Sequence, residues 1–171
     1  MVQIRRKVSE AASYVEGLMF LIDACVENPG ERGCRKAAIP FYDTYPSAES
    51  FGRINNFPDE AGVYAVVRLF SSKGKIHPRV LYVGISHKAG LKKRLSDHFG
   101  KKRSNPDFYS GSRFVNALWE IIQNEDTVYR VLNNDDTRIA VVPIPSASKR
   151  YLEYLERLAI QTLQPLLNVE R

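Results

Sequence analysis

Four side chains with acid–base or charge chemistry stand at spacings that bring them together. Tyr64 closes the tripeptide GVY, and Tyr82 opens the tripeptide YVG. Downstream, Arg94 and His98 lie four residues apart, so on a helix they share one face. Two tyrosine-bearing segments followed by a basic helix would place phenol, guanidinium and imidazole groups in one site.

The two tyrosines belong to segments with strand-like alternation. Residues 63–70 alternate between two faces with a period of two, and residues 79–84 repeat the pattern. Pro78 has no N–H to give to a sheet ladder, so we expect the second strand to begin just after it. In the resulting antiparallel hairpin, Tyr64 and Tyr82 should fall roughly opposite each other on the same face.

A helix is expected over about 91–99, after the second strand. Its apolar side chains recur at helical spacing and should be buried: Leu91, Leu95 and Phe99. On a helical wheel Arg94 and His98 lie along the edge of this stripe. They can therefore face the tyrosines.

The last helix carries a carboxylate among apolar side chains. We expect it to be capped by Ser148 and to end near Leu163, ahead of Pro165. Its buried face should be centred on Leu152, Leu155, Ala159 and Leu163, with Glu156 among them. Burying an ionised carboxylate costs on the order of several kcal/mol without a compensating cation. A bound metal ion or Arg94 would compensate it; the alternative is a buried salt bridge with no chemical role.

Taken together, these residues resemble the GIY-YIG nuclease superfamily. The matching positions are the two tripeptides with Tyr64 and Tyr82, then Arg94, His98, Glu156 and Asn168, covering about residues 62–168. Valine replaces isoleucine in both tripeptides, and the gap between them is longer than in the most compact members. The resemblance implies a metal-dependent endonuclease that hydrolyses phosphodiester bonds in DNA.

The resemblance also implies roles for the site residues. Glu156 would hold one divalent ion, Mg²⁺ with Mn²⁺ as a substitute, because hard cations prefer carboxylate oxygen. Arg94 would clamp the scissile phosphate with its planar fork of donors. Tyr64 and His98 compete for the role of general base, and Tyr82 would orient the water or a phosphate oxygen. Asn168 would have a hydrogen-bonding or structural role in the site.

Basic residues are expected to contact the DNA backbone. The 25 Lys and Arg residues outnumber the 19 Asp and Glu residues, for a formal net charge of +6. An excess of positive charge favours a polyanionic partner, and phosphate contacts supply much of the affinity for nucleic acid. The candidate contacts are Lys73, Lys75, Lys92, Lys93, Lys101, Lys102 and Arg103.

The chain of 171 residues is the size of one α+β (α/β) domain. We expect a small three-stranded, mainly antiparallel sheet flanked by helices. Segments 126–132 and 137–144 both look like strands, and one of them should join the hairpin as its third strand. Residues 59–171 would form the GIY-YIG-like nuclease domain. Residues 1–58 would form an N-terminal helical and loop extension packed on it, with an amphipathic helix over about 9–27.

Several functional alternatives remain open at the level of sequence. An N-terminal extension with no separate DNA-binding domain resembles the restriction-type branch of the superfamily. A structure-specific repair or homing-type nuclease fragment, or a non-catalytic nucleic-acid-binding module of the same fold, is the alternative. No apolar run of about 18 residues and no signal-like N-terminus occur, so we expect a cytoplasmic protein without a membrane partner. The oligomeric state is not determined by the sequence.

Overall fold

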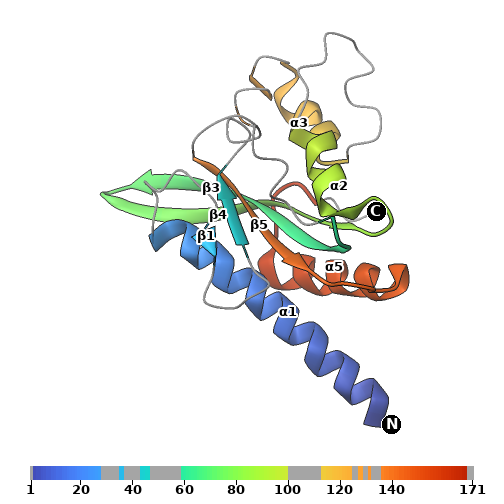
Figure 1. Ribbon diagram of the computed structural model, residues 1–171. Coiled ribbons are helices and arrows are strands. Elements are labelled where there is room, and N and C mark those ends of the chain that lie inside the picture. Colours follow the sequence, from blue (N-terminus) through green and yellow to red (C-terminus); the bar gives the residue numbers. More distant parts are fainter. Residues whose placement is uncertain are drawn as a thin grey trace.

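A computed structural model describes the fold. It describes residues 2–27, 35–36, 43–46, 59–99, 113–124, 127–128, 131 and 136–168. The elements are α1 (Val2–Glu27), β1 (Arg35–Lys36), β2 (Asp43–Pro46), β3 (Gly62–Ser72), β4 (Lys75–Ser86), α2 (Gly90–Phe99), α3 (Arg113–Ile122), β5 (Thr137–Pro143) and α5 (Lys149–Leu163). Figure 1 shows the helices arranged around one twisted sheet.

The sheet is antiparallel throughout, with strand order β1-β2-β5-β3-β4. Its core of β5, β3 and β4 confirms the three-stranded antiparallel arrangement expected from the sequence. The short strands β1 and β2 extend the sheet beyond β5 and were not expected. β4 is left as an edge strand, and this position matters for the site described below.

The hairpin of β3 and β4 is longer than the alternation predicted. Its turn is only Lys73 and Gly74, whose positive φ angles of 51° and 75° suit a tight two-residue connection. β4 begins at Lys75, so the expectation that it starts after Pro78 was wrong. Pro78 lies inside β4, opposite Leu69, and is tolerated because an edge strand needs ladder bonds on one side only.

The register of the hairpin puts the two tyrosines on the same face of the sheet. Tyr64 pairs with Gly84, and Tyr82 pairs with Val66, with a register shift between Val66 and Val67. The tyrosine rings are therefore diagonal neighbours, with centroids 6.3 Å apart. Sequence reasoning predicted the shared face correctly. It placed Tyr82 opposite Tyr64, whereas the residue opposite Tyr64 is Gly84, two positions further along β4.

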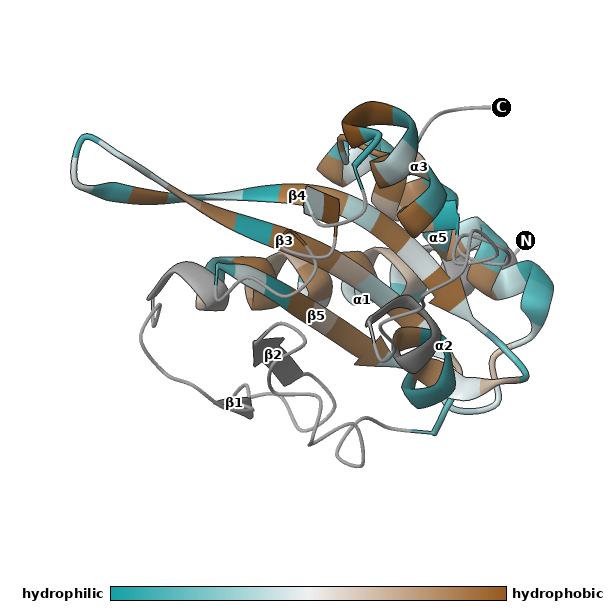
Figure 2. Ribbon diagram, turned by 90° about the horizontal axis from the view of Figure 1, so that it is seen from above, coloured by the Kyte–Doolittle hydropathy of each residue, from teal (hydrophilic) through white to brown (hydrophobic). Residues whose placement is uncertain are grey.

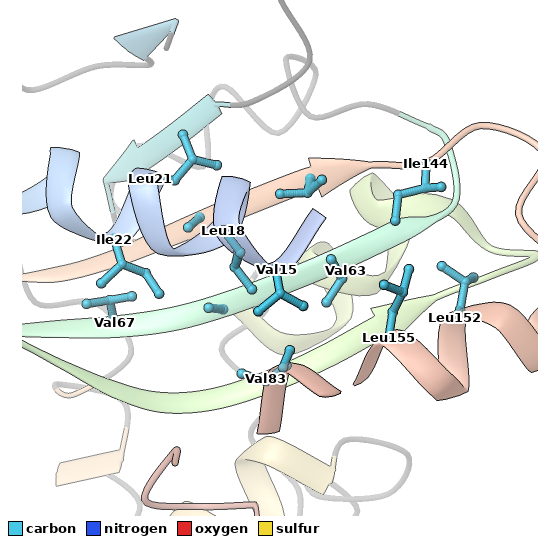
Figure 3. Packing of buried hydrophobic residues seen from close by; sticks show 14 of the residues in the cluster. Val15, Leu18, Leu21, Ile22, Val63, Val67, Val83, Ile144, Leu152 and Leu155 are labelled. Carbon is cyan, nitrogen blue, oxygen red and sulfur yellow. The ribbon is translucent and has the colours of Figure 1, made fainter. Parts of the chain in front are cut away.

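Helices cover both faces of the sheet. On one face α2 and α3 supply Leu91, Leu95 and Phe114 to a core that also contains Tyr64 and Tyr82. We call this the α2/α3 face. On the other, the α1/α5 face, apolar side chains of both helices pack against alternate strand residues, as Figure 3 shows. The amphipathic helix at the N-terminus is thus part of the main core.

The segment between α3 and β5 differs from its prediction. Residues 126–132 were expected to form a strand, but the described residues there, Thr127, Val128 and Val131, are helical. Val128 is fully buried in the core on the α2/α3 face. Short β-branched runs fit either a strand or one buried helical turn, so periodicity alone cannot separate them. The following strand is confirmed as β5.

None of the described helices combines the length and the apolar character that crossing a bilayer requires.

Truncating Leu18 to alanine tests whether α1 belongs to the main core. Leu18 is fully buried between α1 and the sheet, so Leu18→Ala should reduce the free energy of unfolding by about 2–5 kcal/mol. Urea unfolding followed by circular dichroism measures this loss, and Glu16→Ala, at an exposed position of the same helix, is the control. A Leu18→Ala protein as stable as the control would show that α1 does not contribute to the core.

Candidate active site at the sheet edge

Tyr64 lies at the centre of the α2/α3 face, and the glycine opposite it makes its position possible. The Tyr64 side chain is fully buried. A Cβ atom on Gly84 would lie 2.5 Å from the Tyr64 hydroxyl oxygen and 2.8 Å from Cε1 of Tyr82. Any larger residue at 84 would displace the rings, so the glycine of the YVG tripeptide serves to hold both tyrosines over β4.

The glycine of the first tripeptide has a related function. A Cβ atom on Gly62 would overlap the backbone oxygen of Val142 and lie 2.7 Å from Cδ1 of Leu91. Its absence lets β5 and α2 approach β3 closely. The start of α2 is fixed further by Ser86, whose buried hydroxyl donates to the backbone oxygen of Gly90 over 2.6 Å. Gly62 therefore lets α2, and with it Arg94, lie close to β3 and Tyr64.

Arg94 is the cation that α2 brings to the tyrosines. Its side chain is half-buried and forms a hydrogen bond with Tyr64, to whose hydroxyl oxygen a guanidinium N–H donates. Burial and the nearby Tyr82 raise the pKa of Tyr64 far above its ordinary value, and the charge and hydrogen bond of Arg94 only partly oppose this. At neutral pH Tyr64 is therefore a neutral phenol that holds Arg94 in place.

Glu156 enters the same site from the opposite layer. It is half-buried on α5, whose apolar residues Leu152, Leu155 and Ala159 belong to the core of the α1/α5 face. Because β4 is the edge strand, a side chain of α5 can act past that edge on groups of the other face. Burial raises the pKa of the Glu156 carboxyl, while Arg113 and then Arg94 oppose the increase.

The same carboxylate acts on both tyrosines. Burial and then the charge of Glu156 raise the pKa of Tyr82, and Glu156 also contributes to the raised pKa of Tyr64. Arg94 acts electrostatically on all three groups. The structure thus brings together Tyr64, Tyr82, Arg94 and Glu156, which sequence reasoning had placed in one site.

Arg113 is a site residue that sequence reasoning missed. It is the exposed first residue of α3, and it opposes the raised pKa of Glu156 more strongly than Arg94 does. Its neighbour Phe114 is fully buried, with its ring centroid 5.2 Å from that of Tyr82, which anchors α3 beside the tyrosines. The apolar stripe of α3 predicted the helix, and a cation at its first position was the available signal.

Asn168 clamps the strand that carries Tyr82. Its side-chain oxygen accepts from the backbone N–H of Val83 over 2.7 Å, and its amide nitrogen donates to the backbone oxygen of the same residue over 2.8 Å. The backbone N–H groups of Leu166 and Leu167 also donate to β4, at Val80 and Leu81. The C-terminal segment therefore covers the edge of β4 next to Tyr82, and the described contacts of Asn168 are structural.

The other proposed site residues are placed as follows. His98 lies in α2 one turn beyond Arg94, and its side chain is outside the described residues, as are Lys101, Lys102 and Arg103. Lys92 is half-buried and Lys93 exposed on α2. Lys73 and Lys75 are exposed at the tip of the hairpin, about 26 Å along β3 from Tyr64 at ~3.3 Å per residue. They do not join the cluster around Glu156.

Glu156 is the carboxylate that the described part of the chain offers a metal ion at this site. Among the described side chains, no group of three or more His, Cys, Asp or Glu residues could hold an ion. A half-buried carboxylate with a raised pKa gains from a cation, and Mg²⁺ is commonly held by one or two carboxylates with several waters retained. The residues present therefore fit a hydrated hard cation at Glu156 and do not fit a zinc-type ligand set.

Comparison with known proteins gave matches among solved structures only. No family model matches the chain, and no curated protein is detectably similar in sequence. Three crystal structures of point mutants of the GIY-YIG N-terminal endonuclease domain of UvrC from Thermotoga maritima, bound to their catalytic divalent cation, are similar. They are 17–18% identical, cover 70% of this chain and 94% of theirs, and have TM-scores of 0.37–0.38. At these values they carry no weight in the assignments below, which rest on this chain's own side chains.

Replacing Glu156 by glutamine should stabilise the protein at pH 7. The folded state binds the Glu156 proton more tightly than the unfolded chain, where the pKa is about 4.3. This tighter proton binding adds to the free energy of unfolding. The added stability is fully present below the unfolded-state pKa and is lost as the pH rises through the folded-state pKa. At pH 7 the ionised carboxylate therefore destabilises the folded protein. Thermal midpoints of Glu156→Gln should exceed wild type at pH 7 and match it near pH 3.

The matched control is Glu153→Gln, one turn earlier on α5, where the carboxylate forms a salt bridge of 3.6 Å with Lys149. This variant should gain no stability at either pH. A loss of stability in Glu156→Gln at pH 7 would instead indicate that Arg94 and Arg113 form a net favourable ion pair with Glu156.

Proposed function

We propose that this protein is a GIY-YIG nuclease that hydrolyses phosphodiester bonds in DNA with a divalent metal ion. The observation that supports this is the convergence of Glu156, from one side of the sheet edge, with Arg94, Tyr64 and Tyr82 from the other. Hydrolysis of a phosphodiester needs a metal-binding carboxylate, cations for the phosphate and a group that deprotonates water. The four side chains provide the first two of these directly.

Glu156 is the proposed ligand of the metal ion, which we expect to be Mg²⁺ with Mn²⁺ as a substitute. When bound, the ion would supply positive charge for the phosphate oxygens and stabilise the leaving oxygen. Glu156 fits this role because its carboxylate is half-buried at the sheet edge and its pKa is raised by burial. The role of the protein is to hold this one carboxylate in a fixed position beside the arginines.

Two arginines would bind the scissile phosphate. Arg94 is held by its hydrogen bond with Tyr64, which orients its guanidinium group in the site. Arg113 is exposed at the start of α3 and faces the same carboxylate, so it is open to a substrate arriving from solvent. Charge growing on the phosphate oxygens would be stabilised by both guanidinium groups.

We assign the general base to His98 in preference to Tyr64. Burial and Tyr82 raise the pKa of Tyr64, and this leaves almost no phenolate at neutral pH. A histidine with an ordinary pKa near ~6.5 is well matched to accept a proton from water at that pH. His98 follows Arg94 by one turn of α2, on the same face of the helix. Tyr64 then acts by positioning Arg94, and Tyr82 by orienting the water.

Within the superfamily we propose the restriction type. The strand β2 pairs with β5 of the main sheet. The N-terminal helix α1 contributes five fully or nearly fully buried side chains to the core: Ala11, Val15, Leu18, Leu21 and Ile22. The extension is therefore built into the nuclease domain. Recognition of DNA by such a unit would come from the surface that surrounds the catalytic site.

Incubation with supercoiled plasmid and Mg²⁺ tests the proposed activity. The wild-type protein should cut the plasmid, and Glu156→Gln should reduce the rate by roughly 10²–10³-fold or more because the metal ligand is lost. Glu153→Gln, on the same helix, should cut like wild type. Wild-type protein without metal-dependent cleavage would contradict the nuclease proposal, and nicking or smearing in place of discrete fragments would contradict the restriction type.

The pH dependence of the cleavage rate separates the two candidate bases. A base with the ordinary pKa of an imidazole would give a rate that rises with pH and levels off above about pH 7. His98→Ala should lower the plateau and remove the histidine limb of the profile. A wild-type rate that keeps rising to about pH 9 or beyond would instead assign the base to the phenol of Tyr64.

A further inference from the structure

The outer part of the hairpin, residues 68–79, forms an arm that the site does not use. Figure 2 shows β3 and β4 continuing past α2, α3 and α5 as a narrow twisted ribbon, with hydrophilic bands along it. The strands pair without a break to the two-residue turn at Lys73 and Gly74. We call residues 68–79 the hairpin arm.

One face of the hairpin arm continues the face that carries the active site. Along β3 alternate residues share a face, so the positions that follow Tyr64 and Val66 on the α2/α3 face are 68, 70 and 72. Three cross-strand pairs occupy this face of the arm: Arg68 with Arg79, Phe70 with His77, and Ser72 with Lys75. The arm therefore presents a basic and aromatic strip in line with Tyr64.

The opposite face of the arm is apolar and packed. Leu69 belongs to the core of the α1/α5 face, and Ile76 and Val80 pack against it. Along β4 the exposure alternates accordingly, with every basic residue exposed and the residues between them half-buried: Lys75, His77 and Arg79 are exposed; Ile76, Pro78 and Val80 are half-buried. Packing fixes one face, so the basic strip must face solvent.

The charges on this strip are arranged unfavourably for the protein alone. Arg68 and Arg79 stand directly opposite each other, and like charges in a cross-strand pair are destabilising. Nη1 of Arg68 is buried and has no hydrogen-bond partner among the described residues. The guanidinium lies 6.0 Å from the ring centroid of Phe70, which is 44% exposed. A phosphate oxygen beside the exposed Arg79 would relieve the repulsion between the two arginines.

The shape and reach of the hairpin arm fit a duplex. A two-stranded β-ribbon can enter the B-DNA major groove, which is about 12 Å wide, whereas the major groove of A-form RNA is too narrow for side chains to read. From Tyr64 the arm extends about 13 Å to Arg68 and about 26 Å to Ser72. At ~3.4 Å per base pair this corresponds to about four to eight base pairs.

Resting on the proposed nuclease function, we infer that the hairpin arm binds B-form duplex DNA beside the cleavage site. Its basic strip contacts phosphates about four to eight base pairs from the scissile bond. Arg68, Lys75 and Arg79 supply the cations, and the tip around Lys73 enters the major groove. The arm would thus orient the duplex across the sheet edge.

The salt dependence of binding tests this inference. The probe is a fluorescein-labelled 30-bp DNA duplex of mixed sequence, with binding to the full chain measured by anisotropy in EDTA. Replacing Lys75 and Arg79 by glutamine removes two exposed cations from the arm. The slope of log K against log salt should fall in magnitude by about 1.8, because each phosphate contact contributes about 0.9.

The matched control is Lys149→Gln with Arg150→Gln, two exposed cations at the start of α5 on the other side of the sheet. It should leave the slope unchanged. The inference would be overturned if the arm variant kept the wild-type slope. It would also be overturned if the control variant lost as much slope as the arm variant. An equal change of slope on a 30-bp RNA duplex would overturn the assignment to B-form DNA.

Plasmid cleavage separates this inference from the proposed function. Arm variants with a reduced slope and a wild-type protein without metal-dependent cleavage would support the arm and reject the nuclease. Metal-dependent cleavage that is lost in Glu156→Gln, together with an unchanged slope in the arm variant, would support the nuclease and reject the arm.

Discussion

The arrangement of the site depends on one carboxylate held half-buried beside the edge of a sheet. Glu156 projects from a helix on one side and acts on groups that belong to the other. The position of β4 at the end of the sheet, among the strands that the structure describes, allows this. The burial that raises the pKa of the carboxyl also makes a cation there favourable, and Arg94 and Arg113 supply part of that compensation. One carboxylate between two arginines leaves a net positive charge, which a divalent ion would increase and which would attract a phosphate.

Several small features keep that edge in position. Without a side chain on Gly84, the rings of Tyr64 and Tyr82 can lie over β4, and without one on Gly62, α2 can approach β3. An exposed strand edge would ordinarily be open to pairing with another chain. Here the Asn168 side-chain amide forms hydrogen bonds with both the backbone N–H and the backbone oxygen of Val83. The edge is therefore closed by a side chain, and a fully paired strand, which would shield the tyrosines from Glu156, is avoided.

Much of this could be predicted from the sequence, and the exceptions have physical reasons. Alternation gave the hairpin and its shared face, and helical periodicity with the Ser148 cap gave α5 and the unusual position of Glu156. The start of β4 was misplaced because the rule against proline in strands does not hold at an edge. Arg113 was missed because its partner, Glu156, is 43 residues away and the packing of Phe114 on Tyr82 joins them only in the fold. No local pattern encodes such a contact.

The two faces of the sheet differ in what they contact, and this explains how one hairpin can carry both the candidate active site and the hairpin arm. The α1/α5 face of β3 is apolar along its length, from Val63 to Leu69, and α1 and α5 bury most of it. That continuous packing stabilises the hairpin without requiring apolar residues on the other face. The α2/α3 face is then free to change character, from buried tyrosines near α2 to exposed cations beyond the helices. Since both stretches lie on one hairpin, strand length would set the distance between the proposed cleavage site and the proposed binding arm, and a duplex that contacts the arm would be held in a fixed register relative to Glu156.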